Sequence, residues 1–217
     1  MASGLETLSS RIAEHGFCVQ HQFLDPREVE LWSRQARGSF RDGGFRPAGI
    51  GRGEGHRIRS EVREDHVRWL DPPGATASER RYFELIELLR QTLNRELTLG
   101  LFGFEAHLAL YLPEARYRCH LDQFQDEGDR VLSTSLYLNP DWGADDEGFL
   151  RLYLDEPESK PFEDVLPVGG TLVCFLSGRF HHEVLPSRRE RLSATGWFTR
   201  SRSAPGAPRG DAGRGRS

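Results

Sequence analysis

The fold is constrained most by the part of the chain beyond Gly100, where short apolar or alternating segments recur. Clusters of turn residues, such as NPDWGADDEG and PVGG, separate them. Short strands joined by turns predict a β-sandwich or barrel, because βαβ units would place long helical patterns between the strands. The expected strands are Leu101–Leu112, Tyr117–Phe124, Arg130–Leu138, Phe149–Tyr153, Thr171–Leu176, His182–Leu185 and Arg191–Phe198.

The first hundred residues predict helices instead. We expect a short amphipathic helix that ends at Gly16, a strand over Phe17–Phe23, a helix with a capping box from Asp25 to about Gly38, and a helix over Ser78–Thr98 behind a serine cap. The fold class is therefore α+β, with N-terminal helices packed on one sheet of a jelly-roll core. We predict one domain over residues 1–199, with a helical part at 1–99 and the core at 100–199.

Charge and composition narrow the classes of function. The net charge is −4, and the tail Arg200–Ser217 carries five arginines and one aspartate, so the rest of the chain is strongly acidic. An acidic body does not suit a protein that neutralises phosphates, so we expect no nucleic-acid partner. The Arg/Gly/Ser tail, residues 200–217, is typical of disorder.

The sequence favours a cytoplasmic protein. It has no signal-peptide pattern and no apolar segment near the roughly 20 residues of a membrane span, so we expect no membrane association. The three cysteines are isolated, which favours a reducing compartment. The glycine-rich segment Arg41–Glu61 lacks the GK[ST] of a phosphate loop, and we interpret it as a mobile loop or hairpin beside the site.

A candidate metal site begins at His120 and Asp122, which are two apart in an expected strand. Alternation places both side chains on one face, roughly 7 Å apart at the backbone. Alone, this pattern is weak and is more typical of a surface histidine beside a turn aspartate. His181 and His182 precede another expected strand and offer a third ligand. Two histidines and one carboxylate form a facial triad that leaves positions open, which suits Fe(II) oxygenation better than a closed zinc site.

A candidate anion site lies near Arg191, nine residues after His182. Alternation in RLSATGWF puts Arg191, Thr195 and Trp197 on one face. A buried arginine needs an anionic partner, and a carboxylate matches its planar fork. Tyr137 offers a hydroxyl for the same carboxylate. The alternative is a bridge from Arg191 to an acidic side chain of the protein.

These motifs, taken in order, resemble the iron(II)- and 2-oxoglutarate-dependent dioxygenases of the prolyl hydroxylase type, in particular the SM-20-related and hypoxia-inducible-factor prolyl hydroxylases. The similar segments include Ile58–Leu70, LYLPEARYRCHLD, SLYLNPDW, FLRLY, GGTLVCFLS and HHEVLPSRRERLSATGWF. The resemblance implies a double-stranded β-helix and covers most of the chain.

The resemblance also implies roles for individual residues. His120, Asp122 and His182 would bind the iron, and Arg191 with Tyr137 would bind the far carboxylate of 2-oxoglutarate. Of the adjacent histidines, His182 keeps the spacing to Arg191. The residues that would line the co-substrate pocket are Tyr111, Thr195 and Trp197. Tyr117 matches an aromatic residue near the site, and Arg130 a substrate-contacting arginine.

The activity so implied is hydroxylation of a C–H bond, most simply in a prolyl residue of a protein or peptide. It uses Fe(II), 2-oxoglutarate and O2, with ascorbate as a reductant, and releases succinate and CO2. A monomer is favoured. Two alternatives stay open: an oxygenase for a small molecule such as a free amino acid, and a jelly-roll sensor that binds metal and ligand without turnover.

Overall fold

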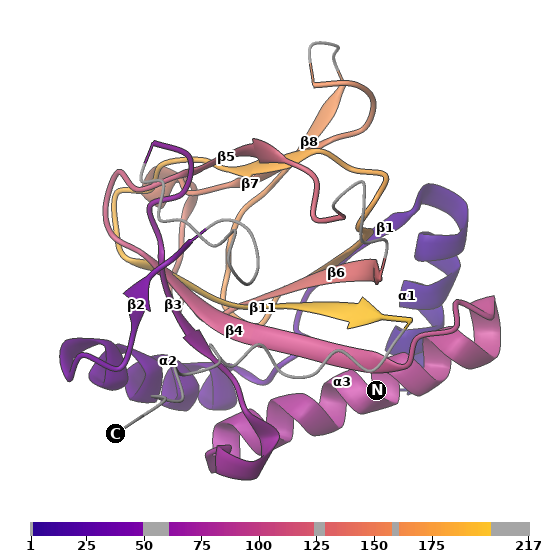
Figure 1. Ribbon diagram of the computed structural model, residues 1–217, viewed down its shortest axis with the longest axis horizontal. Coiled ribbons are helices and arrows are strands. Elements are labelled where there is room, and N and C mark those ends of the chain that lie inside the picture. Colours follow the sequence, from indigo (N-terminus) through magenta and orange to yellow (C-terminus); the bar gives the residue numbers. More distant parts are fainter. Residues whose placement is uncertain (1, 50–60, 124–128, 158–160, 201–217) are drawn as a thin grey trace, which may run out of the picture.

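Two antiparallel sheets face each other at the centre of the molecule (Figure 1). The computed structural model describes residues 2–49, 61–123, 129–157 and 161–200. The larger sheet has the strand order β1-β9-β6-β11-β4-β3-β2, and the smaller sheet has the order β5-β10-β7-β8. This arrangement confirms the predicted α+β class with a jelly-roll core.

Most of the strands coincide with the predicted segments to within a few residues. β2, β3 and β8 were not predicted from the sequence, and the reason is that they lie at or beside sheet edges and bury little apolar surface. The strands are β1 (Phe17–Gln20), β2 (Arg46–Pro47), β3 (His66–Trp69), β4 (Gly103–Tyr111), β5 (Tyr117–His120), β6 (Arg130–Tyr137), β7 (Leu150–Tyr153), β8 (Phe162–Val165), β9 (Leu172–Leu176), β10 (His182–Val184) and β11 (Arg191–Thr199).

Among the described residues, three α-helices precede the core strands, namely α1 (Ala2–His15), α2 (Pro26–Arg41) and α3 (Ala77–Leu97). The predicted capping box at the start of α2 is present, with Asp25 as the N-cap. The predicted serine cap of α3 is wrong. Thr76 is the N-cap, because its hydroxyl accepts from the backbone N–H of Glu79 and the Glu79 carboxylate accepts from the backbone N–H of Thr76.

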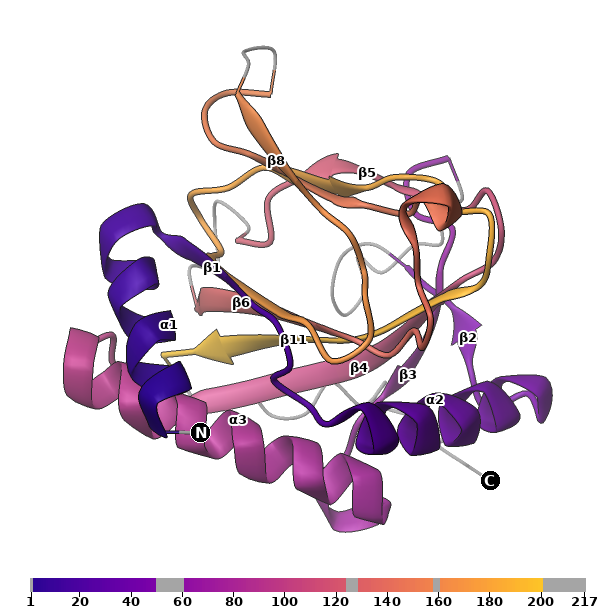
Figure 2. The same ribbon diagram turned by 180° about the vertical axis from the view of Figure 1, so that it is seen from behind.

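The helices lie along the outer face of the larger sheet (Figure 2). Their apolar residues form one buried cluster with alternate residues of the strands, for example Leu89 of α3 with Leu108 of β4 and Leu192 of β11. A second, smaller cluster fills part of the space between the two sheets. Burial of apolar side chains on the helix-covered face of the larger sheet fixes its strand register, because a slip of one residue would exchange the two faces.

Alternation along β11 therefore separates the core from the pocket. Leu192, Ala194 and Phe198 belong to the cluster beneath the helices. Arg191, Ser193, Thr195 and Trp197 face the other way and line a pocket between the sheets, as the alternation predicts. The larger sheet thus contributes one apolar face to stability and one polar face to a site.

Some predictions concern residues that the structure does not describe. Part of the expected loop or hairpin, residues 50–60, lies outside the described ranges, as do residues 201–217 of the expected tail. The single domain over residues 1–199 stays a prediction. No helix in the described part of the chain is both long and apolar enough to cross a lipid bilayer.

Candidate active site

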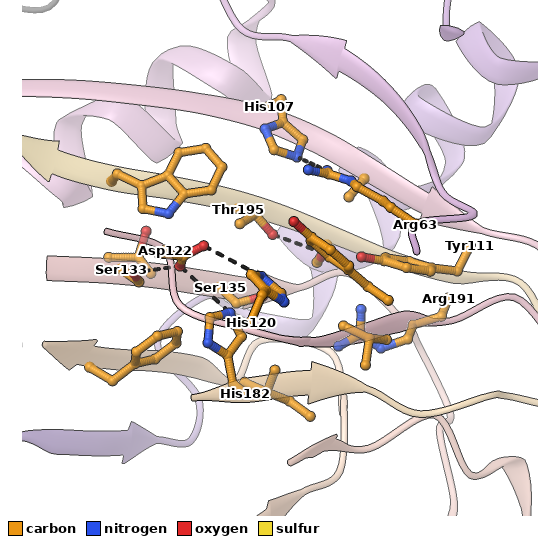
Figure 3. Close-up of a pocket in the computed structure, with 18 residues that line it drawn as sticks. Arg63, His107, Tyr111, His120, Asp122, Ser133, Ser135, His182, Arg191 and Thr195 are labelled. Carbon is orange, nitrogen blue, oxygen red and sulfur yellow. Dashed lines mark hydrogen bonds and ion pairs between the residues drawn. The ribbon is translucent and has the colours of Figure 1, made fainter. Parts of the chain in front are cut away.

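The pairing of β5 with β10 brings two distant histidines together. His120 ends β5, His182 begins β10, and the two residues are direct partners in the antiparallel ladder. The strand was predicted to extend to Phe124, but β5 ends at His120. Asp122 therefore lies two residues beyond the end of β5. One ligand atom from each of His120, Asp122 and His182 lies within 4.8 Å of the others (Figure 3).

Backbone carbonyl groups orient both imidazole rings. Nδ1 of His120 lies 2.7 Å from the carbonyl oxygen of Arg118, and Nδ1 of His182 lies 3.2 Å from that of Phe180. A carbonyl oxygen only accepts hydrogen bonds, so each Nδ1 carries the hydrogen. Each Nε2 therefore has a free lone pair, and each lies 3.6 Å from an oxygen of Asp122. This arrangement is typical of histidines that bind a metal.

Asp122 and His182 are buried, His120 is half-buried, and the protonation states of the cluster suit the binding of a cation. Burial raises the pKa of Asp122, but His182, His120 and the Ser133 hydroxyl outweigh this effect and hold the pKa below its ordinary value. Burial and the neighbouring His120 together lower the pKa of His182 to about 4. At neutral pH the site therefore has an ionised carboxylate and a neutral His182, which are the protonation states that metal ligands need.

The residues present fit Fe(II). Two imidazole nitrogens and one carboxylate oxygen match the donor set of non-haem Fe(II) oxygenases, which keeps coordination positions open. A structural zinc site would use four protein ligands, and the described residues supply three at this position. His181 is not part of the cluster.

The far end of the pocket contains a buried cation. Arg191 is 1% exposed, and its Nε donates to the carbonyl oxygen of Gly148 at 2.9 Å. Its guanidinium carbon lies 5.3 Å from the ring centre of Tyr111 and 5.0 Å from that of Tyr137. Among the described residues, no acidic side chain forms an ion pair with Arg191. The alternative of an internal bridge therefore has no support in this part of the chain.

A hydroxyl group beside Arg191 is also left without a partner. Tyr137 is fully buried, and its Oη has no hydrogen-bond partner among the described residues. Leaving such a group unpaired is costly, as is leaving a buried charge unpaired. A carboxylate would satisfy both, since it accepts from a guanidinium and from a phenol. This end of the pocket fits the far carboxylate of 2-oxoglutarate.

The remaining predicted residues line the pocket, except Arg130, which contacts the pocket residue Trp197. Tyr111, Thr195 and Trp197 line it, and Tyr117 stacks on the ring of His120, with ring centres 3.7 Å apart and planes inclined by 18°. Arg130 lies over the ring of Trp197 at 3.6 Å and pairs with Glu105 at 2.7 Å. Whether Arg130 contacts a substrate stays a prediction.

Sequence reasoning missed a cationic network on one wall of the pocket. Arg63 binds Asp65 through two hydrogen bonds of 2.6 and 2.8 Å, and its Nη2 lies 3.2 Å from Nε2 of His107. Its guanidinium also lies 4.7 Å from the ring centre of Tyr117. Alternation on the strand of Tyr111 places His107 on the same face, so that residue was predictable. Arg63 lies outside every predicted strand, so its place in the pocket was not predictable.

The fold and the site together define a class, namely a jelly-roll protein with a two-histidine, one-carboxylate cluster that could hold a metal, and with a buried arginine at the far end of the same pocket. Comparison with known proteins identifies the family. The sequence pattern of the 2OG-Fe(II) oxygenase superfamily matches residues 106–199. A crystal structure of a *Pseudomonas putida* prolyl-4-hydroxylase is 40% identical, with a TM-score of 0.81, over 91% of this chain and 99% of that one.

Two further proteins are similar at lower sequence identity. A *Trichoplax adhaerens* prolyl hydroxylase, solved with a peptide of hypoxia-inducible factor, superposes with a TM-score of 0.77 at 23% identity over 90% of this chain and 88% of that one. A *Caenorhabditis elegans* hypoxia-inducible factor prolyl hydroxylase is 29% identical over 85% of this chain, which spans 27% of that protein. The chain belongs to the 2OG-Fe(II) oxygenase superfamily, in its prolyl hydroxylase type, whose members use Fe(II), 2-oxoglutarate and O2.

Proposed function

We propose that this protein is an Fe(II)- and 2-oxoglutarate-dependent dioxygenase that hydroxylates a prolyl residue of a protein or peptide. The observation that carries the proposal is a single pocket that joins the His120–Asp122–His182 cluster to the unpaired Arg191. A site for a metal alone would need only the cluster, whereas a co-substrate with a far carboxylate needs both ends. A sensor that binds metal and ligand without turnover would also use both ends, and succinate release distinguishes it from an enzyme.

The proposed metal ligands are Nε2 of His120, Nε2 of His182 and the carboxylate of Asp122. When bound, Fe(II) supplies the activation of O2 that converts a substrate C–H to C–OH while 2-oxoglutarate is converted to succinate and CO2. The protein contributes fixed imidazole rings, an ionised carboxylate and a pocket between the two sheets.

Arg191 and Tyr137 are proposed to hold the far carboxylate of 2-oxoglutarate. Arg191 donates from its remaining N–H groups, because its Nε is already bonded to Gly148. Tyr137 donates from its unpaired hydroxyl. Tyr111, Thr195 and Trp197 complete the walls of this pocket. The contact orients the co-substrate and lowers the entropic cost of reaction.

The choice of a prolyl substrate is supported by the likeness to the *P. putida* prolyl-4-hydroxylase, which extends over nearly the whole of both chains. The peptide bound to the *T. adhaerens* enzyme supports a protein or peptide partner. We also propose that the protein acts as a monomer in the cytoplasm, without nucleic-acid or membrane partners, and that ascorbate keeps its iron reduced. Consistent with a reducing compartment, none of the three cysteines forms a disulfide.

The test is to supply the purified protein with Fe(II), 2-oxoglutarate and cell extract, and to measure succinate together with the mass of captured proteins. We expect succinate release coupled to the gain of one oxygen atom on a prolyl residue, and neither product with His120→Ala. Oxygen found only on a small molecule would contradict the prolyl assignment. Metal binding without succinate release would identify a sensor.

A further inference from the structure

Two buried hydroxyl groups form a chain that ends on the carboxylate of the metal cluster. Ser133 Oγ lies 2.6 Å from Oδ2 of Asp122 (Figure 3), and Ser177 Oγ lies 2.8 Å from Ser133 Oγ. Ser133 is 1% exposed and Ser177 is fully buried. Polar groups buried this deeply are stable only when they are hydrogen-bonded, so these two hydrogen bonds belong to the folded interior and are not incidental surface contacts.

The direction of the two hydrogen bonds follows from the number of hydrogens. An ionised carboxylate only accepts, so Ser133 must donate its single hydroxyl hydrogen to Asp122. The oxygen of Ser133 then accepts, and Ser177 must be its donor. Bonds that run in one direction toward a charge strengthen one another. The chain Ser177 to Ser133 to Asp122 therefore delivers one strong hydrogen bond to Oδ2.

The three ligands of the cluster are held in different ways. The two histidines lie in paired strands, and their rings are bonded to backbone carbonyls near them in sequence. Asp122 lies beyond the end of β5 and outside every strand. Its bond to Ser133 of β6 connects it to the larger sheet across the pocket. The carboxylate thus depends on side chains for its orientation, whereas the imidazoles depend on the backbone.

We propose that Ser133 and Ser177 are positioning residues that hold Asp122 for metal binding. The hydroxyl of Ser133 engages Oδ2 and leaves the lone pairs of Oδ1 for the ion. Without it, the carboxylate loses its preferred rotation and its affinity for the metal falls. The inference rests on the proposed function, because it requires a metal at this cluster.

The test is titration of the metal-free protein with Mn(II), with the unbound ion measured by electron paramagnetic resonance. Loss of a hydrogen-bond partner of a metal ligand weakens binding by about 10- to 100-fold, so we expect Ser133→Ala to raise the Kd by that factor. Ser133→Thr keeps the hydroxyl and suits a strand, and should return the Kd to within about threefold of wild type. Ser177→Ala should give a smaller rise, about two- to fivefold, because it acts through Ser133.

A matched control is Ser135→Ala. Ser135 lies two residues along the same strand and lines the same pocket, and none of the hydrogen bonds of the described residues joins it to Asp122. Its substitution should leave the Kd for Mn(II) within about twofold of wild type. Thermal unfolding of each metal-free variant shows whether it is folded. If Ser133→Ala does not fold, the Kd values of Ser177→Ala and Ser135→Ala for Mn(II) are compared instead. A higher Kd for Ser177→Ala supports the positioning role, and equal values contradict it.

The outcomes separate this inference from the proposed function. If wild type binds Mn(II) and Ser133→Ala binds it equally well, the positioning role is wrong while the metal site stands. The same conclusion follows if Ser133→Thr binds as weakly as Ser133→Ala. If wild type binds no Mn(II), the metal site itself is wrong, and the positioning role with it.

Discussion

The two ends of the pocket differ in how their polar groups are satisfied. At the metal end, His120, His182 and Asp122 all have hydrogen-bond partners within the protein. At the far end, Arg191 has no acidic partner and Tyr137 has no hydrogen-bond partner among the described residues. The protein therefore fixes the proposed metal ligands in advance and leaves polar groups without partners at the far end, where we propose that a carboxylate binds.

The largest expected effect is at the metal end. We expect His182→Ala to lower succinate production by more than about 100-fold, because the loss of even a partner of a metal ligand costs about 10- to 100-fold. His181→Ala is the matched control, since the neighbouring histidine is outside the cluster and should leave the rate near that of wild type. Equal losses in both variants would show that His182 was wrongly chosen.

The next effect is at the far end. Removal of one partner of a buried charge pair costs about 2–5 kcal/mol, so Arg191→Met should raise the KM for 2-oxoglutarate by about 100-fold. Arg151→Met is the control, because Arg151 is paired with Asp164 on the smaller sheet. Affinity for Mn(II) should be the same in both variants. A parallel loss of metal binding in Arg191→Met would mean that the two ends are not separate.

A smaller effect tests whether the Tyr137 hydroxyl lacks a hydrogen-bond partner in the unliganded protein. Tyr137→Phe removes a hydroxyl that we propose to bond only to 2-oxoglutarate, so the Kd for this co-substrate should rise by about tenfold. The unliganded variant should be at least as stable as wild type, since removing an unsatisfied buried hydroxyl costs nothing and gains up to about 1 kcal/mol. Urea unfolding measures the stability of the unliganded variant and of the wild type. A marked fall in stability would show that the hydroxyl is satisfied without ligand.

The smallest effect concerns His107, whose Nε2 is satisfied by Arg63 near the metal end. Burial, Arg63 and Arg130 all lower its pKa well below 6.5, so the unfolded chain binds more protons than the folded one below that pH. Stability contributed by neutral His107 is complete above pH 6.5 and is lost as the pH falls. Between pH 8 and 5.5 the loss is on the order of 1 kcal/mol. Urea unfolding of the metal-free protein and of His107→Phe should show this difference in slope, and equal slopes would contradict it.

The sequence was informative wherever a residue's position follows from local periodicity. Alternation in RLSATGWF correctly separates Arg191, Thr195 and Trp197 from the apolar residues between them. The sequence was less informative where position depends on strand ends and edges. Asp122 reaches the cluster from beyond β5 and not from within it, although the expectation that it lies near His120 is correct.

Contacts between distant segments were not predictable. Ser133 and Ser177 meet because β6 and β9 are neighbours, and nothing in either segment marks these serines as different from other buried ones. Arg63 joins the pocket through an isolated bridge to Tyr117. Such pairings are set by the global packing of the two sheets, which local propensity does not contain.

The ladder between β5 and β10 contains an irregularity: His182 faces His120, but Val184 faces Tyr117. β5 therefore uses one residue more than β10 over the same stretch, which is what a bulge does to re-aim a side chain. Inserting or deleting a single amino acid between these two pairs would turn one imidazole toward solvent while leaving every ligand in the sequence. Insertions and deletions should thus be tolerated in surface loops but not in β5 or β10, although β5 is an edge strand of the smaller sheet.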